Sequence, residues 1–177
     1  MGNTIISLKL NDKDINRAIR EVKKYKRDFI KKSNLFRKRV AKEIAKLAQR
    51  GFDSSGVDDT LTGGLRQADV TVDVSDNGNI SVVIAQGEDA VWCEFGAGVY
   101  YNGAVGSSPN PYGAKNGLTI GSYGKGHGKQ SVWGYYSDPG DKNSLVLTRG
   151  TQATMPMYRA VQDVIPIVVR LAGEVFG

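Results

Sequence analysis

The residues best suited to chemistry lie in two short stretches of the chain. The first, residues 91–101, places Glu94 among apolar and aromatic side chains, shortly before two glycines. The second, residues 121–131, is rich in glycine and contains His127, the one histidine of the sequence. A carboxylate and an imidazole could serve a nuclease as general base and general acid.

Glu94 also has a structural interpretation, which we favour. A segment as apolar as residues 91–95 is expected to pack in the core as a short helix, and Gly96 and Gly98 would end that helix in a tight turn with positive φ. Glu94 would then accept hydrogen bonds that fix this turn. Cys93, the one cysteine, cannot form an internal disulfide and is expected to be a small buried hydrophobic residue.

Residues 121–131 do not fit a phosphate-binding loop. Counting back from the Gly-Lys pair at 128–129, the first glycine that such a loop requires falls on Tyr123, and Gln130 replaces the Ser or Thr that would hold magnesium. A zinc site would need further histidines or a cysteine cluster beside His127. The sequence therefore predicts no cofactor, no metal and no catalytic residue, with His127 in an exposed loop.

Charge is distributed unevenly along the 177 residues. Residues 9–50 hold 16 of the 24 Lys and Arg but 5 of the 18 Asp and Glu, which leaves 8 basic and 13 acidic residues elsewhere. A basic segment on a mildly acidic body indicates two faces with different partners.

The basic segment has helical periodicity. Apolar residues recur three or four positions apart from Ile15 to Leu47, which predicts a long amphipathic helix that Gly51 ends. Its opposite face is almost wholly Lys and Arg; it is either solvated surface or a face for DNA or an acidic protein. The residues assigned to this face are Lys23, Lys24, Arg27, Lys31, Lys32, Arg37 and Lys38.

The remaining segments predict a small mixed domain. Residues 70–74 and 80–84 alternate around Asn77-Gly78 and predict a hairpin with a type I′ turn. Further strands are expected at 4–10, 132–136 and 145–147, and loops at 52–67 and, rich in glycine, at 102–131. A C-terminal helix should begin at a Thr154 cap, with Pro156 in its first turn. No apolar run approaches the roughly 20 residues that span a bilayer, so no membrane contact is expected.

Four motifs, in this order, resemble those of the gene-product-ten-like tail-component family of long-tailed phages. Residues 92–98 resemble its hydrophobic-x-EFG-T/A-G element, residues 133–136 its W-x-Y element, and residues 148–150 its T-x-G element. Residues 152–157 resemble P-A-x-P-F-M, with Gln152 and Met157 departing from it. The motif residues are Trp92, Glu94, Phe95, Gly96, Gly98, Trp133, Gly150 and Pro156.

The resemblance implies a structural morphogenesis protein and not an enzyme. It implies one α+β domain over residues 1–177, with a long N-terminal helix and a C-terminal helix packed on a curved antiparallel sheet. Neck and tail-completion proteins of this kind form homo-oligomeric rings at the head–tail junction. Their neighbours are head-closure or connector proteins and tail-terminator or tail-tube proteins, with phage DNA as a further contact.

Such a protein would reside in the virion, and in the host cytoplasm before assembly. The alternative is a nucleic-acid-binding or nuclease protein that uses the basic N-terminal helix.

Overall fold

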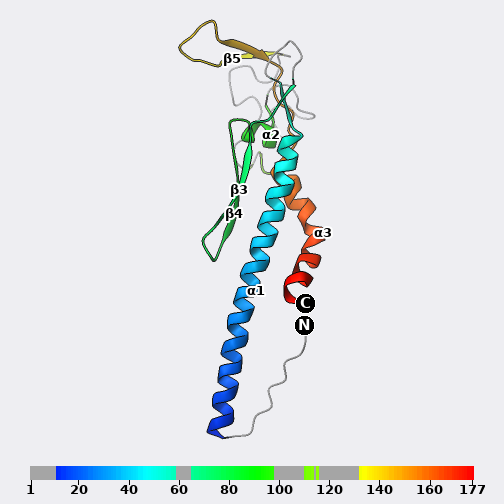
Figure 1. Ribbon diagram of the computed structural model, residues 1–177. Coiled ribbons are helices and arrows are strands. Elements are labelled where there is room, and N and C mark those ends of the chain that lie inside the picture. The colour runs from blue at the N-terminus through cyan, green and yellow to red at the C-terminus, as the bar shows by residue number, and fades with distance from the viewer. Residues whose placement is uncertain (1–10, 59–64, 98–109, 114, 116–131) are drawn as a thin grey trace.

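The computed structural model describes residues 11–58, 65–97, 110–113, 115 and 132–177 (Figure 1). The helices are α1 (Asp12–Asp53), α2 (Ala90–Phe95) and α3 (Pro156–Phe176). The strands are β1 (Gly56–Asp58), β2 (Leu65–Gln67), β3 (Thr71–Asp76), β4 (Ser81–Gln86), β5 (Trp133–Tyr136) and β6 (Leu145–Thr148). The predicted α+β class is confirmed.

The 42 residues of α1 form one continuous helix. The Asn11 side chain accepts a hydrogen bond of 2.8 Å from the Asp14 N–H, which satisfies one of the free donors at the helix start. The predicted end at Gly51 is wrong, because α1 continues to Asp53 and Ser54 forms its C-cap. A glycine within a helix is tolerated where a neighbouring element comes very close, as α3 does here.

Helices α1 and α3 pack side by side and antiparallel (Figure 1). Gly51 lies against Pro156 at the start of α3, while Phe36 contacts Phe176 at its end with ring centroids 5.8 Å apart. Along α1, small alanines are buried at positions 41, 45 and 48. Figure 1 shows that α1 extends well beyond the end of α3, so α3 covers only the C-terminal part of α1.

Strands β3 and β4 form the predicted hairpin, which packs on α1. The turn differs from the prediction: among the four residues between the strands only Gly78 has positive φ, whereas a type I′ turn needs two. Asn77 instead holds the turn with its side-chain oxygen, which accepts hydrogen bonds from the N–H groups of Asn79 and Ile80. Gln49 of α1 fixes the other end by bonding Val72 N–H and Val70 C=O.

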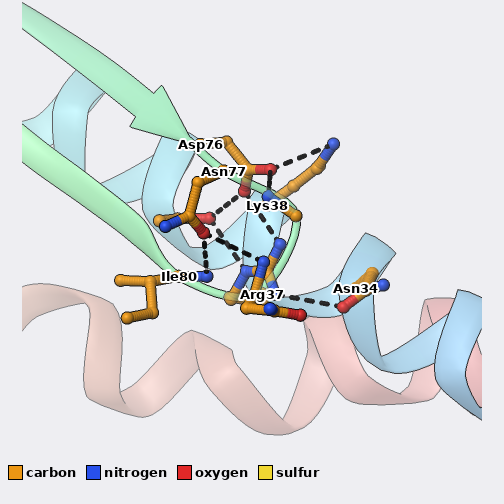
Figure 2. Close-up of polar contacts among 9 residues, drawn as sticks. Asn34, Arg37, Lys38, Asp76, Asn77 and Ile80 are labelled. Atoms are coloured by element: carbon orange, nitrogen blue, oxygen red, sulfur yellow. Dashed lines mark hydrogen bonds and ion pairs between the residues drawn. The ribbon is translucent and has the colours of Figure 1, made fainter.

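A cluster of charges joins α1 to the tip of the hairpin (Figure 2). Arg37 donates to Asp76 at 2.9 Å and to the Ser81 hydroxyl at 3.0 Å, and Lys38 approaches the same carboxylate at 3.3 Å. Hydrogen bonds from the Ser81 hydroxyl and the Gly78 N–H, with Arg37 and Lys38 alongside, hold the pKa of Asp76 well below its usual range. The cluster therefore sets where the hairpin lies along α1.

The strands of the described residues form three separate two-stranded antiparallel sheets, not one curved sheet. Strands β5 and β6 match the prediction, but the loop predicted for 52–67 is wrong, since it contributes β1 and β2. Val57 of β1 is buried with Phe52, Val70 and Cys93 in the main core cluster, so tertiary burial organises a segment whose composition is typical of a loop. The strand predicted at 4–10 lies outside the described residues, as does the loop at 102–131 except for 110–113 and 115.

No helix in the described ranges is long and apolar enough to cross a membrane.

The contact between α1 and α3 makes a prediction for Gly51. A Cβ at this position would lie 2.9 Å from Pro156 Cβ and 3.2 Å from its Cα, so Gly51→Ala must push the helices apart. We expect a loss of about 1–3 kcal/mol in the free energy of unfolding. Gly173→Ala is the matched control, because nothing lies within 4 Å of that position in α3. It should stabilise by about 0.4–1 kcal/mol. Thermal melts in which both variants shift in the same direction would contradict this packing.

Candidate functional site

Helix α2 places Glu94, the candidate catalytic carboxylate, in the core. Cys93 and Glu94 are buried, and Gly96 ends the helix with φ of 83°. The expected short core helix with a positive-φ glycine cap is confirmed. Burial raises the pKa of Cys93 to about 11, so this thiol is protonated near neutral pH and is a poor nucleophile.

The Glu94 carboxylate caps the N-terminus of α3. Its Oε2 accepts a hydrogen bond of 2.8 Å from the Met157 N–H, and its Oε1 accepts one of 3.0 Å from the Tyr158 N–H. The N-cap residue of α3, Met155, provides no side-chain cap and has φ of 55°. The prediction of a Thr154 cap is therefore wrong: this role falls to a carboxylate from another helix, whose negative charge also suits the positive end of the helix dipole.

Thr154 has a different role in the same region. Its N–H donates to Cys93 C=O at 2.9 Å, and its hydroxyl lies 2.6 Å from the Ser55 hydroxyl. Ala97 and Thr151 exchange two backbone hydrogen bonds of 2.8 Å. The segment 92–97 is thus joined to 151–158 along its length, although some 55 residues separate them in the sequence.

Asn110 completes the environment of Glu94. This buried side chain donates to Glu94 Oε1 at 2.7 Å. Among the described residues, the carboxylate accepts three hydrogen bonds, and they come from Asn110 and the start of α3 and not from Gly96, at the turn where its partners were expected. The prediction that Glu94 accepts structural hydrogen bonds is correct in kind, but the element that it fixes is the start of α3.

Beside Glu94 lies a largely apolar cleft of about 440 Å³, with Phe52, Ala90, Met157 and Val161 in its walls. Burial raises the pKa of Glu94, and the bonds from Met157, Tyr158 and Asn110 oppose this rise without cancelling it. Because both carboxylate oxygens are occupied by these donors, Glu94 is poorly placed to take a proton from a substrate.

Glu94 is the only acidic side chain among the described residues that line this cleft. Across the ranges that the structure describes, no cluster of three or more His, Cys, Asp or Glu side chains could hold a metal ion. His127 and Gly98 lie outside those ranges. Of the other motif residues, Trp92 and Phe95 are half-buried in α2, Gly150 is buried with φ of 98°, and Trp133 is placed as the first residue of β5.

The buried polar residues at this end of the molecule that were missed from the sequence include Asp89 and Asn110. Asp89 receives 2.9 Å and 2.8 Å hydrogen bonds from Arg66 and the Asp69 N–H. Although burial opposes ionisation, these donors hold the pKa of Asp89 below its usual value. Asn110 is the other, and it follows Pro109 in a glycine- and proline-rich stretch, so no periodicity could have marked it as buried.

The basic face divides into two parts. Lys23, Lys24, Arg27, Lys31 and Lys32 are exposed on α1, as expected for a face open to solvent or a partner. Arg37 and Lys38 were assigned to the same face, but they are occupied in the Asp76 cluster of Figure 2. Their role is to hold the β3–β4 hairpin on α1, because Asp76 supplies the counter-charge within the same chain.

No protein-family model, curated protein or solved structure matches the chain.

The cap makes a prediction for Glu94. Glu94→Ala leaves two N–H groups of α3 and the Asn110 amide without their acceptor, so we expect a loss of about 1–3 kcal/mol in the free energy of unfolding. Glu88→Ala is the matched control, since Glu88 is exposed in the turn before α2. Chemical denaturation should separate the two variants clearly. Equal stabilities would show that the cap is unimportant.

The raised pKa of Glu94 determines how the stability loss in Glu94→Ala depends on pH. A carboxyl group whose pKa is higher in the folded state than in the unfolded state contributes most stability below its ordinary value of 4.5. That contribution declines as the pH rises from 4.5 through the folded-state pKa. The stability difference between wild type and Glu94→Ala should therefore be larger near pH ~4 than near pH ~7.

Proposed function

We propose that the chain is a structural morphogenesis protein of the head–tail junction of a long-tailed phage. It would act by assembling as a ring between the head connector and the tail. The observation that carries this proposal is the convergence of the motifs. Residues 92–98, 148–150 and 152–157 carry separate motifs. Cys93 bonds Thr154 of the third motif, Ala97 bonds Thr151 directly after the second, and Glu94 caps the helix at Met157, so these segments meet in one place.

The roles of the motif residues support a structural function. Gly96 and Gly150 have φ of 83° and 98°, a region that favours glycine. Pro156 occupies the first turn of α3 and packs on Gly51, and Glu94 caps that helix. Each of these four roles concerns the backbone or packing, and none requires a reaction.

The exposed surface supports assembly. Large apolar side chains that are more than 40% exposed occur on α1, on α3 and on the β3–β4 hairpin; they include Ile19, Val169 and Val82. Exposed apolar surface on several elements is typical of a subunit that contacts more than one neighbour. The proposed neighbours are further copies of the chain, head-closure or connector proteins, and tail-terminator or tail-tube proteins.

A second candidate function is nucleic-acid binding by the basic face of α1. It is favoured by the exposure of Lys23, Lys24, Arg27, Lys31 and Lys32 along one helix. Ionic contacts of this kind with phosphates weaken steeply as salt rises. In the proposed ring the two functions are compatible, since the basic face could line the channel through which DNA leaves the head.

Deleting the gene from the phage that encodes it tests the proposed function. We expect DNA-filled heads and complete tails that fail to join, because the junction lacks its ring. Electron microscopy of lysates would show the two separate particles, and supplying the protein in trans should restore joined virions. Joined, infectious particles in the deletion strain would overturn the proposal.

Replacing Lys23, Lys24, Lys31 and Lys32 with Gln tests the basic face. These side chains are exposed, so the melting temperature should stay within about 2 °C of wild type. Retention of DNA in the particles should fall, and any binding of the isolated protein to duplex DNA should lose part of its salt dependence. A quadruple variant with normal infectivity would identify this face as solvated surface.

A further inference from the structure

The N-terminal part of α1 carries an apolar stripe that no other residue described by the structure covers completely. Ile15, Ile19 and Val22 follow helical spacing and are 41%, 46% and 53% exposed. Further along α1 the same stripe meets the end of α3, where Phe29 and Phe36 contact Phe176 with ring centroids 6.1 Å and 5.8 Å apart. Figure 1 shows the N-terminal end of α1 reaching past both α3 and the tip of the β3–β4 hairpin.

This stripe lies in a strongly basic segment. Residues 12–32 contain nine Lys and Arg against four Asp and Glu. Lys26 is one turn from both Val22 and Phe29, which places it on the apolar face, and Lys23 lies one turn from Ile19 at its edge. Of the nine basic residues only Arg17 forms an ion pair within the described part of the chain, with Asp14 at 3.3 Å. The partner of the stripe must therefore be both apolar and acidic.

The outer face of the β3–β4 hairpin has that chemistry. The register pairs Asp73 with Ile84 and Ser75 with Val82, so these four side chains share the face that points away from α1. Val82 is 47% and Ile84 is 37% exposed. The segment around them, residues 67–113, contains no Lys or Arg. Of its six Asp and Glu, three are bonded within the molecule (Asp76, Asp89 and Glu94), and three are exposed (Asp69, Asp73 and Glu88). Asp73 is exposed and makes no ion pair with any residue that the structure describes.

We infer that the apolar stripe of α1 in one copy docks on the outer face of the β3–β4 hairpin in the next copy. Two α1 stripes would not pair with each other, because like charges would then face one another across the contact. The contact uses different surfaces on the two copies, so it is heterologous. Each copy can therefore bind one further copy through the surface that is still free. The inference rests on the proposed ring and specifies its subunit interface.

Cysteine cross-linking tests this contact on the full chain. Val22→Cys and Val82→Cys change exposed positions, so both variants should fold. The native Cys93 is fully buried with a raised pKa and should not react. A mixture of the two variants, treated with a short bis-maleimide at low salt, should give a covalent dimer. The double variant Val22→Cys/Val82→Cys should give a ladder of larger species, since a heterologous contact repeats.

The matched control replaces Val82→Cys with Val169→Cys. Val169 is 80% exposed on α3, so its thiol is more accessible but lies on another face. We expect at least about tenfold less dimer from this mixture, the ratio that ~1.4 kcal/mol of specific contact produces. Equal yields in the two mixtures, or no dimer in either, would overturn the inference.

Charge exchange provides an independent measurement. Adding Lys23→Glu and Lys26→Glu to the Val22→Cys copy should lower the yield about tenfold. Adding Asp73→Lys and Ser75→Lys to the Val82→Cys copy should then restore it, which a loss of folding could not do. A yield unaffected by both pairs of substitutions would contradict the charge complementarity.

Residues 4–10 of the same chain are the competing occupant of the stripe. A within-chain cross-link between Cys at position 22 and Cys at position 6 (Ile6→Cys), in place of the dimer, would mean that this segment covers the stripe, and would overturn the inference. If gene deletion leaves heads and tails unjoined but no cross-link forms between copies, the contact fails and the proposed function stands.

Discussion

The hydrogen bonds between the Glu94 carboxylate and the start of α3 are the interaction on which the rest of the molecule depends. Helix α3 begins after Met155, whose side chain supplies no cap, so its first N–H groups need an acceptor from elsewhere. Glu94 supplies both oxygens, and burying its charge is acceptable because three donors surround it. With α3 fixed to α2, Pro156 meets Gly51, and that contact sets how α3 lies along α1.

Periodic patterns made much of the fold predictable. The spacing from Ile15 to Leu47 and the alternation around Asn77-Gly78 reflect local geometry, and the structure contains the long helix and the hairpin. The errors arise where tertiary contacts outweigh composition. Val57 brings a loop-like segment into the core as β1, and close packing against Pro156 lets α1 run through Gly51. A single sequence holds no local signal for either contact.

The candidate site was predictable in part for the same reason. An isolated carboxylate in an apolar segment must accept hydrogen bonds, and this much follows from Glu94 and its neighbours alone. Its donors are Asn110, Met157 and Tyr158, which lie 16, 63 and 64 residues away. Spacing cannot reveal partners at such separations. The same limit explains Arg37 and Lys38, whose counter-charge at Asp76 lies 39 residues from Arg37.

The uneven charge of the chain has a physical consequence for α1. Within the C-terminal part of that helix, Arg37 and Lys38 meet Asp76, and Arg39 meets Glu174 at 3.1 Å, so the acidic body neutralises nearby basic residues. The N-terminal part extends beyond the hairpin and α3, where consecutive basic turns repel one another and an apolar stripe faces water. A helix of this kind draws most of its stability from packing. A surface that covers the apolar stripe and neutralises the basic turns must be apolar and acidic, as the body of the same chain is.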